Sequence, residues 1–165
     1  MNIYAFAMQM EKEGENYYRQ LAEQSRSAGI KKIFIMLANE EVKHYHLIEQ
    51  LSKKADSPHL AQTRVLEDVK NIFVGMKESR EEVHVDTTEE VQKYRKARDI
   101  EDQSQKFYRE KAAETDDEVE RRIFLQLAGE EAKHLRIMEN IVEFVSRPEP
   151  GHWLENAEWT HLDEY

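Results

Sequence analysis

The 165-residue sequence contains no cysteine, so it cannot form a disulfide or hold iron through thiolates. Glycine (5) and proline (3), which interrupt helices most strongly, are scarce. No apolar run approaches the roughly 20 residues of a membrane span, and no charged-then-apolar leader opens the chain. We therefore expect a cytoplasmic protein that does not bind membranes. Basic residues number 24 against 34 acidic ones, and the resulting charge of −10 argues against nucleic acid as a partner.

Helix-forming residues dominate, and apolar residues recur at helical spacing. The pattern predicts helices at about 2–26, 29–54, 58–79, 88–114 and 117–146. Short turns at Ser25–Gly29 and Thr115–Asp117 separate the first two and the last two helices. Ser57-Pro58 is the expected start signal of the third helix, and Thr87-x-x-Glu90 is a capping box for the fourth.

Residues 1–51 align with residues 91–141 without a gap, and 15 of the 51 positions are identical. Chance would give roughly three identities, so the unit is duplicated. A unit of this length that occurs only twice favours two fused helical hairpins over a solenoid. The duplicated positions include three pairs of polar residues: Glu11 and Glu101, Glu41 and Glu131, His44 and His134.

In each copy, the turn falls midway between the lone Glu and the Glu-x-x-His pair. Antiparallel helices would therefore bring these residues to the same height. The two half-sites can meet only if the hairpins are antiparallel to each other, which requires a connection along the bundle. Residues 55–87 are long enough, because a helix of about 22 residues spans roughly 33 Å. We predict an all-α, antiparallel four-helix bundle of ferritin-like topology.

In this prediction residues 1–147 form the bundle, with hairpins at 1–54 and 88–147 and the helix-containing crossover at 55–87. The segment 148–165 contains Trp153 and Trp159, and we expect it to pack on the bundle or on a second subunit. The expected assembly is a homodimer.

Glutamate and histidine three residues apart on a helix share one face. Two such pairs and two lone glutamates supply four carboxylates and two imidazoles, which suit a pair of iron, manganese or zinc ions. We expect the ligands to be Glu11, Glu41, His44, Glu101, Glu131 and His134; the alternative is a surface salt-bridge network. The pairs Glu81/His84 and Glu158/His161 share the spacing but lie outside the repeat, so we expect no metal there.

Tyr18 and Tyr108 follow the lone glutamates by two helical turns. They are either core aromatics or donors that orient a ligand carboxylate. Weaker candidates for such an orienting role are Glu40, Glu130, Asp99 and Gln103.

The series Glu11…Tyr18, Leu37-Ala38…Glu41-x-x-His44, with its second copy at 101–134, resembles the rubrerythrin-like branch of the ferritin-like superfamily, without a rubredoxin domain. The segment 155–165 also resembles the tail of short members. The resemblance implies a non-haem di-iron oxidoreductase that reacts with hydrogen peroxide or dioxygen. It implies two iron ions per chain, manganese or zinc being possible substitutes, with Glu41 and Glu131 bridging them.

The resemblance also implies an external electron donor, a separate rubredoxin-like chain, since this sequence has no cysteine-bound iron. Rubrerythrins proper have a seventh ligand, a glutamate, where this chain has Ser104; its repeat counterpart is Gly14. The six remaining residues are similar to a bacterioferritin ferroxidase centre. A ferroxidase or iron-handling protein, a manganese catalase-like protein and a non-catalytic metal-binding bundle stay open as alternatives.

Overall fold

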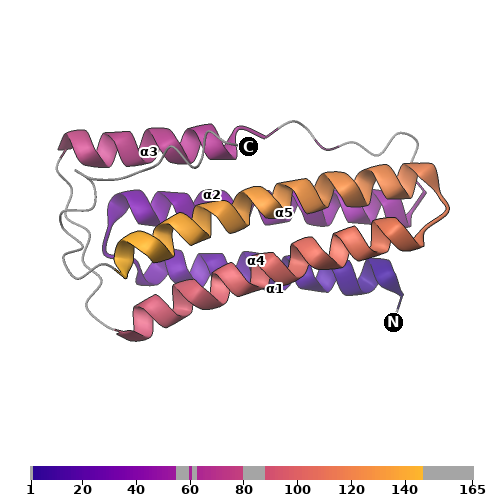
Figure 1. Ribbon diagram of the computed structural model, residues 1–165, viewed down its shortest axis with the longest axis horizontal. Helices are drawn as coiled ribbons and strands as arrows, with labels where there is room; N and C mark the ends of the chain where they lie inside the picture. The colour runs from indigo at the N-terminus through magenta and orange to yellow at the C-terminus, as the bar shows by residue number, and fades with distance from the viewer. Residues whose placement is uncertain (1, 55–59, 61–62, 80–87, 147–165) are drawn as a thin grey trace.

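The computed structural model describes residues 2–54, 60, 63–79 and 88–146, in which all regular structure is helical (Figure 1). The helices are α1 (Ile3–Gln24), α2 (Ala28–Ser52), α3 (Val65–Ser79), α4 (Thr88–Glu114) and α5 (Glu118–Val145). The predicted all-α, ferritin-like bundle is confirmed, and the four long helices end within two residues of their expected bounds. Among the described helices, none is long and apolar enough to cross a bilayer.

Side-chain caps explain where three of the four long helices begin. Asn2 accepts a hydrogen bond from the backbone N–H of Ala5 at 2.7 Å, and Ser27 accepts one from Ile30 at 3.2 Å. Asp117 accepts two, from backbone N–H groups in the first turn of α5. Each cap satisfies N–H groups that lack a partner within their own helix. Ser27 and Asp117 thereby allow both hairpin turns to be short.

The crossover helix begins later than expected. The predicted start near residue 58 is wrong, because Leu60, Thr63 and Arg64 are not helical and α3 begins at Val65. The Thr63 hydroxyl accepts the backbone N–H of Val65 at 3.1 Å and donates to the Glu40 carboxylate. This pair of bonds fixes a turn just before the helix. The proposed start signals at Ser57-Pro58 and Thr87 lie outside the described residues.

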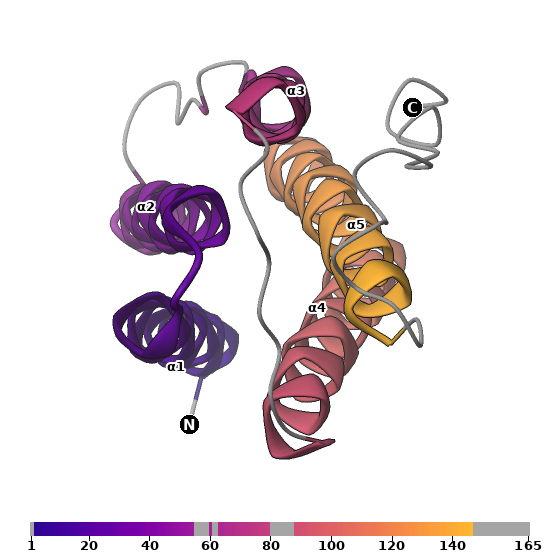
Figure 2. The ribbon, with the colours of Figure 1, turned by 90° about the vertical axis from the view of Figure 1, so that its left-hand side faces the viewer.

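The two hairpins lie side by side and run antiparallel to each other. Figure 2 shows α1 and α2 on one side and α4 and α5 on the other, with α3 at the top, in contact with α2 and α5. Figure 1 shows that the turn between α1 and α2 and the turn between α4 and α5 are at opposite ends of the bundle. The crossover therefore returns the chain along the length of the bundle, as the repeat predicted.

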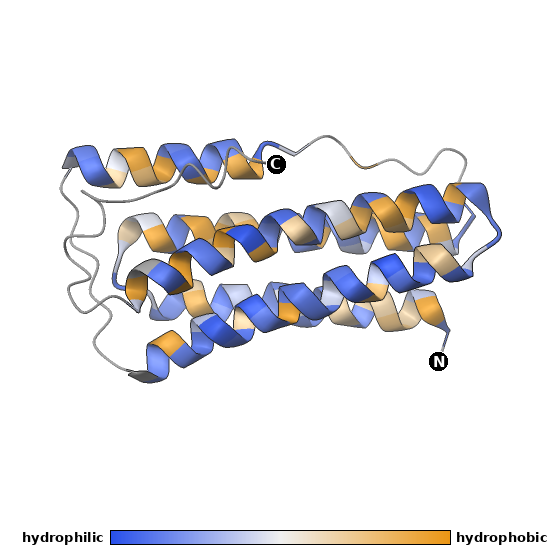
Figure 3. Cartoon of the chain, in the orientation of Figure 1, coloured by the Kyte–Doolittle hydropathy of each residue, from blue (hydrophilic) through white to orange (hydrophobic). Residues whose placement is uncertain are grey.

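Hydrophobic residues form two separate core clusters. The first contains Tyr18, Phe34 and residues of α3, and the second contains Tyr108 and Phe124. Along each of the four long helices, the lone glutamate or the Glu-x-x-His pair falls between the residues of one cluster and those of the other. Figure 3 shows the corresponding mixture of hydrophobic and hydrophilic positions along the helices. The fold thus places a polar layer between two apolar cores.

Candidate metal centre

The six residues singled out from the repeat converge in this polar layer. One comes from α1, two from α2, one from α4 and two from α5, and all are at most 3% exposed. They form two groups whose possible ligand atoms lie within 4.8 Å of one another. The first group is Glu11, Glu41, His44 and Glu131, and the second is Glu41, Glu101, Glu131 and His134. Both groups share the same two glutamates, from the two Glu-x-x-His pairs.

Each imidazole faces carboxylates of both hairpins. His44 Nδ1 is 2.7 Å from Glu131 Oε1 and 3.5 Å from Glu11 Oε2. His134 Nδ1 is 3.0 Å from Glu41 and 3.5 Å from Glu101. The two rings stack with centroids 5.4 Å apart. The surface salt-bridge alternative is wrong for these residues, because all six are buried and point at one another.

Two buried tyrosines orient the lone glutamates. The Tyr18 hydroxyl donates to Glu101 at 2.6 Å, and the Tyr108 hydroxyl donates to Glu11 at 2.5 Å. Burial, followed by the charges of nearby carboxylates, raises the pKa of both tyrosines well above the usual value. The hydroxyls therefore keep their protons and remain donors. Each bond runs to the opposite hairpin.

The four carboxyl groups divide into two classes by protonation. Burial, reinforced by neighbouring carboxylates, raises the pKa of Glu41 and Glu131 well above the usual value. Burial also acts to raise the pKa of Glu101, but hydrogen bonds with Glu131, His134 and Tyr18 outweigh it and lower the pKa to about 2. The pKa of Glu11 is lowered for the same combination of reasons. The two shared glutamates therefore lose their protons less readily than ordinary carboxyl groups, and a cation bound there would displace those protons.

The pKa of His134 is raised above its usual value. Burial works to lower the pKa, but the negative charge of Glu101 overcomes it, with smaller contributions from Glu40 and Glu130. Glu40 and Glu130 are themselves buried, at 7% exposure each. Their effect on His134 places them in the neighbourhood of the site.

The other expected orienting residues lie elsewhere. Asp99 and Gln103 are exposed, so they do not orient a ligand. Gly14, by contrast, lies against the site: a Cβ atom at this position would be 3.3 Å from Glu41 Oε2. The sequence does not predict the contact between Thr63 and Glu40, because no local pattern shows where the crossover packs on α2. The pairs Glu81/His84 and Glu158/His161 and the segment 148–165 lie outside the described residues.

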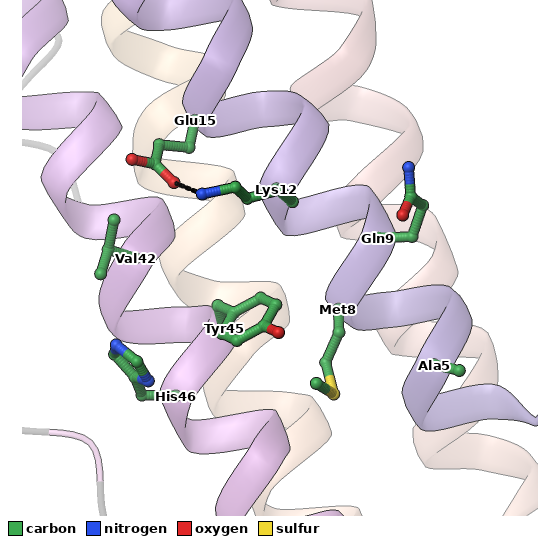
Figure 4. A pocket seen from close by; sticks show the side chains of 8 residues that line it. All are labelled: Ala5, Met8, Gln9, Lys12, Glu15, Val42, Tyr45 and His46. Carbon is green, nitrogen blue, oxygen red and sulfur yellow. Dashed lines mark hydrogen bonds and ion pairs between the residues drawn. The ribbon is translucent and has the colours of Figure 1, made fainter.

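Two surface grooves of the described residues are lined by residues other than the six. One groove of about 450 Å³ lies between α1 and α2 (Figure 4). Its lining consists of Ala5, Met8, Gln9, Lys12, Glu15, Val42, Tyr45 and His46. The other, of about 500 Å³, lies between α4 and α5 and is largely acidic. The six residues of the buried layer thus lie outside these two grooves.

The donor set fits a pair of cations. Glu11 Oε2 and Glu101 Oε2 are buried and lack a hydrogen-bond partner among the described residues. Four carboxylates packed together repel one another, and a pair of cations between them would offset this repulsion. Carboxylate oxygens and imidazole nitrogens are suitable donors for iron, manganese and zinc. Buried Glu and His groups that could hold metal are therefore present.

Comparison with models of protein families matches the rubrerythrin family over residues 2–142. No curated protein and no solved structure matches the chain. The matched range includes all six residues of the candidate centre and both tyrosines that bond to it.

Proposed function

The chain belongs to the rubrerythrin family, whose members are di-iron carboxylate proteins, and on this premise we propose that it is a non-haem di-iron oxidoreductase. Its oxidising substrate in this proposal is hydrogen peroxide or dioxygen. The observation that carries the proposal is the pair of overlapping ligand groups. A single-metal site would not need two groups that share two carboxylates.

The assignment of ligands follows from the overlap. Glu41 and Glu131 belong to both groups, so they are the bridging carboxylates in this proposal. Glu11 and His44 complete one metal position, and the equivalent pair from the second hairpin, Glu101 and His134, completes the other. The proposed cofactor is two iron ions per chain, with manganese or zinc as substitutes.

When bound, two ferrous ions would supply the two electrons that reduce peroxide to water. The protein's own part is to hold the donors and to keep bulk water away. Tyr18 and Tyr108 hold the terminal carboxylates by short hydrogen bonds, which fixes their orientation. The two apolar clusters on either side of the layer exclude water, and a water-poor site strengthens the interaction between charges.

Re-reduction needs an electron donor from outside the chain, because the sequence has no cysteine to hold an electron-transfer iron. A rubredoxin-like protein supplied as a separate chain has the required chemistry. We also propose a homodimer. Size-exclusion chromatography with light scattering measures the mass of the assembly.

The test of the oxidant is anaerobic loading with ferrous iron followed by stopped-flow mixing. Peroxide and dioxygen are added separately, and oxidation is followed by absorbance. Rapid oxidation by either reagent supports the proposal and identifies the preferred oxidant. An iron-loaded sample that neither reagent oxidises would refute the oxidoreductase function and leave a non-catalytic metal-binding bundle.

A second function, ferroxidase activity with iron handling, is favoured by one observation. Ser104, where rubrerythrins proper have a seventh ligand, is buried, and its side chain is too short to replace a glutamate. A symmetric six-residue set remains. Continued oxidation of many ferrous ions per chain, together with a particle of about two dozen subunits, would favour this function over a dimeric peroxidase.

A further inference from the structure

Five buried side-chain atoms lack a hydrogen-bond partner in the described part of the chain. They are Glu11 Oε2, Glu101 Oε2, Glu130 Oε2, His134 Nε2 and Asn140 Oδ1. Two of these residues, Glu130 and His134, are four residues apart on α5. Side chains with this spacing lie on the same face of a helix. The unpaired carboxylate oxygen and the unpaired ring nitrogen therefore belong to side chains on one face of α5. Buried polar atoms are rarely left unpaired without a reason.

Metal binding would change which hydrogen-bond partners the His134 ring requires. Its Nδ1 atom faces the carboxylates, 3.0 Å from Glu41, so Nδ1 is the atom that would take a metal ion. A neutral imidazole that carries a metal on one nitrogen carries its proton on the other. His134 Nε2 then becomes a buried N–H donor, and leaving such a donor unpaired costs about 1–3 kcal/mol.

Besides the glutamates of the candidate centre, the carboxylates of Glu40 and Glu130 are close enough to affect the charge of this ring. The two differ in the groups that already bind them. Glu40 accepts a hydrogen bond from Thr63 through Oε1, and its Oε2 is 3.5 Å from the Lys43 ammonium. Glu130 bonds Lys133 at 3.0 Å through Oε1 alone. Its Oε2 is buried and free. Of these two repeat-related carboxylates, Glu130 is therefore the one with a buried oxygen that can accept a further hydrogen bond.

We propose that Glu130 is a positioning residue whose Oε2 accepts the Nε2–H of metal-bound His134, directly after a side-chain rotation or through one buried water. Such a bond holds the ring with Nδ1 toward the two shared glutamates and sets the tautomer. The inference rests on the proposed function, because it requires a metal at Nδ1. It also makes the two halves of the site unequal, since Thr63 of the crossover engages the counterpart, Glu40.

The test uses zinc, which is diamagnetic and allows NMR of the ring nitrogens. We expect Glu130→Leu to weaken zinc binding at one of the two positions about 10- to 100-fold. In the zinc-loaded variant the Nε2–H of His134 should exchange faster with water than in the wild type. Glu40→Leu is the matched comparison, because it also removes a buried carboxylate near the ring. It should weaken zinc binding less than Glu130→Leu does and leave the Nε2–H exchange of His134 near the wild-type value. Glu130→Gln, whose amide oxygen still accepts, should recover most of the affinity.

Unchanged zinc affinity and unchanged Nε2–H exchange in Glu130→Leu would overturn the inference. An equal loss in Glu40→Leu would also overturn it, because the effect would then be one of buried charge or packing. If Glu130→Leu does not fold, Glu130→Met, which keeps the length and lacks a strong acceptor, takes its place under the same criteria. If the wild-type protein binds neither zinc nor iron, the proposed function itself fails, which is a different result from normal binding by both variants.

Discussion

Tyr18 of the first hairpin donates its hydroxyl to Glu101 of the second at 2.6 Å. The equivalent bond in the repeat joins Tyr108 of the second hairpin to Glu11 of the first. The duplicated units therefore exchange donors: each one orients the lone glutamate of the other. Because all four side chains are buried, the two bonds link the hairpins at the height of the candidate centre.

Removing one of these hydroxyls should destabilise the fold and weaken metal binding. Tyr18→Phe leaves a buried carboxylate without its donor, and hydrogen bonds to charged groups contribute about 1.5–3 kcal/mol. Tyr17→Phe is a matched control, since the Tyr17 hydroxyl donates to the uncharged backbone carbonyl of Lys93 at 2.7 Å. Urea unfolding with and without zinc measures both effects. A loss in Tyr18→Phe no larger than in Tyr17→Phe would contradict the orienting role.

The metal-free protein should respond to pH in opposite ways at two glutamates. Burial and nearby carboxylates raise the folded-state pKa of Glu41 well above its ordinary value of 4.5. Its contribution to stability is therefore complete below pH 4.5 and is lost as the pH rises through the folded-state pKa. Glu41→Gln imitates the protonated form at every pH. It should raise the stability of the metal-free protein at pH 7, by on the order of 1–3 kcal/mol, and change little at pH 4.

Glu11→Gln is the counterpart. Hydrogen bonds with Glu41, His44 and Tyr108 overcome the effect of burial and lower the pKa of Glu11. Its contribution to stability is present above pH 4.5 and is lost as the pH falls through the folded-state pKa. Glu11→Gln should therefore destabilise the metal-free protein at pH 7. Thermal unfolding in chelator, measured from pH 4 to pH 9, compares the variants; the same sign for both at pH 7 would refute the division of the carboxyl groups.

Metal should stabilise the fold, and the shared glutamates should be essential for this effect. A ligand that binds only the folded state adds about 2.7 kcal/mol at 100 times its Kd. Glu41→Ala combined with Glu131→Ala should abolish the binding of two metal ions and the associated rise in Tm. Metal analysis after anaerobic reconstitution and calorimetry measure these quantities. Two irons per chain in the double variant would refute the bridging assignment.

Gly14 should be needed for the placement of Glu41. An added Cβ would lie 3.3 Å from Glu41 Oε2, so the carboxylate would have to move by a few tenths of an ångström. At Gly129, on α5, an added Cβ meets nothing within 4 Å. Gly129→Ala should therefore stabilise the protein by about 0.5–1 kcal/mol, as is usual within a helix.

Gly14→Ala should lack this gain and should lower the affinity for zinc. Calorimetric titration with zinc and thermal unfolding of the two alanine variants provide the comparison. Equal stabilisation and equal zinc affinity in both variants would show that the clearance beside Glu41 has no role.

The start of the crossover helix cannot be predicted from the local sequence. Ser57-Pro58 is a reasonable start signal, yet α3 begins at Val65. The competing signal is the Thr63 hydroxyl, which bonds both Val65 and Glu40. A bond between positions 23 residues apart depends on where the crossover lies on α2, and no local pattern encodes that position.

The sequence by itself determined the four long helices, the pairing into hairpins and the six residues of the candidate centre. It did so because helical periodicity is local and because a gapless repeat shows which polar residues share a role. Tertiary structure alone decided that Tyr18 bonds Glu101 rather than its own hairpin's glutamate, and that Gly14 faces Glu41. Tertiary structure also decided that Glu40 accepts a hydrogen bond from Thr63, whereas Glu130 keeps one oxygen without a partner. These contacts depend on how the two hairpins and the crossover pack against one another. The repeat places equivalent residues in both hairpins, so it does not predict where the surroundings of the two copies differ.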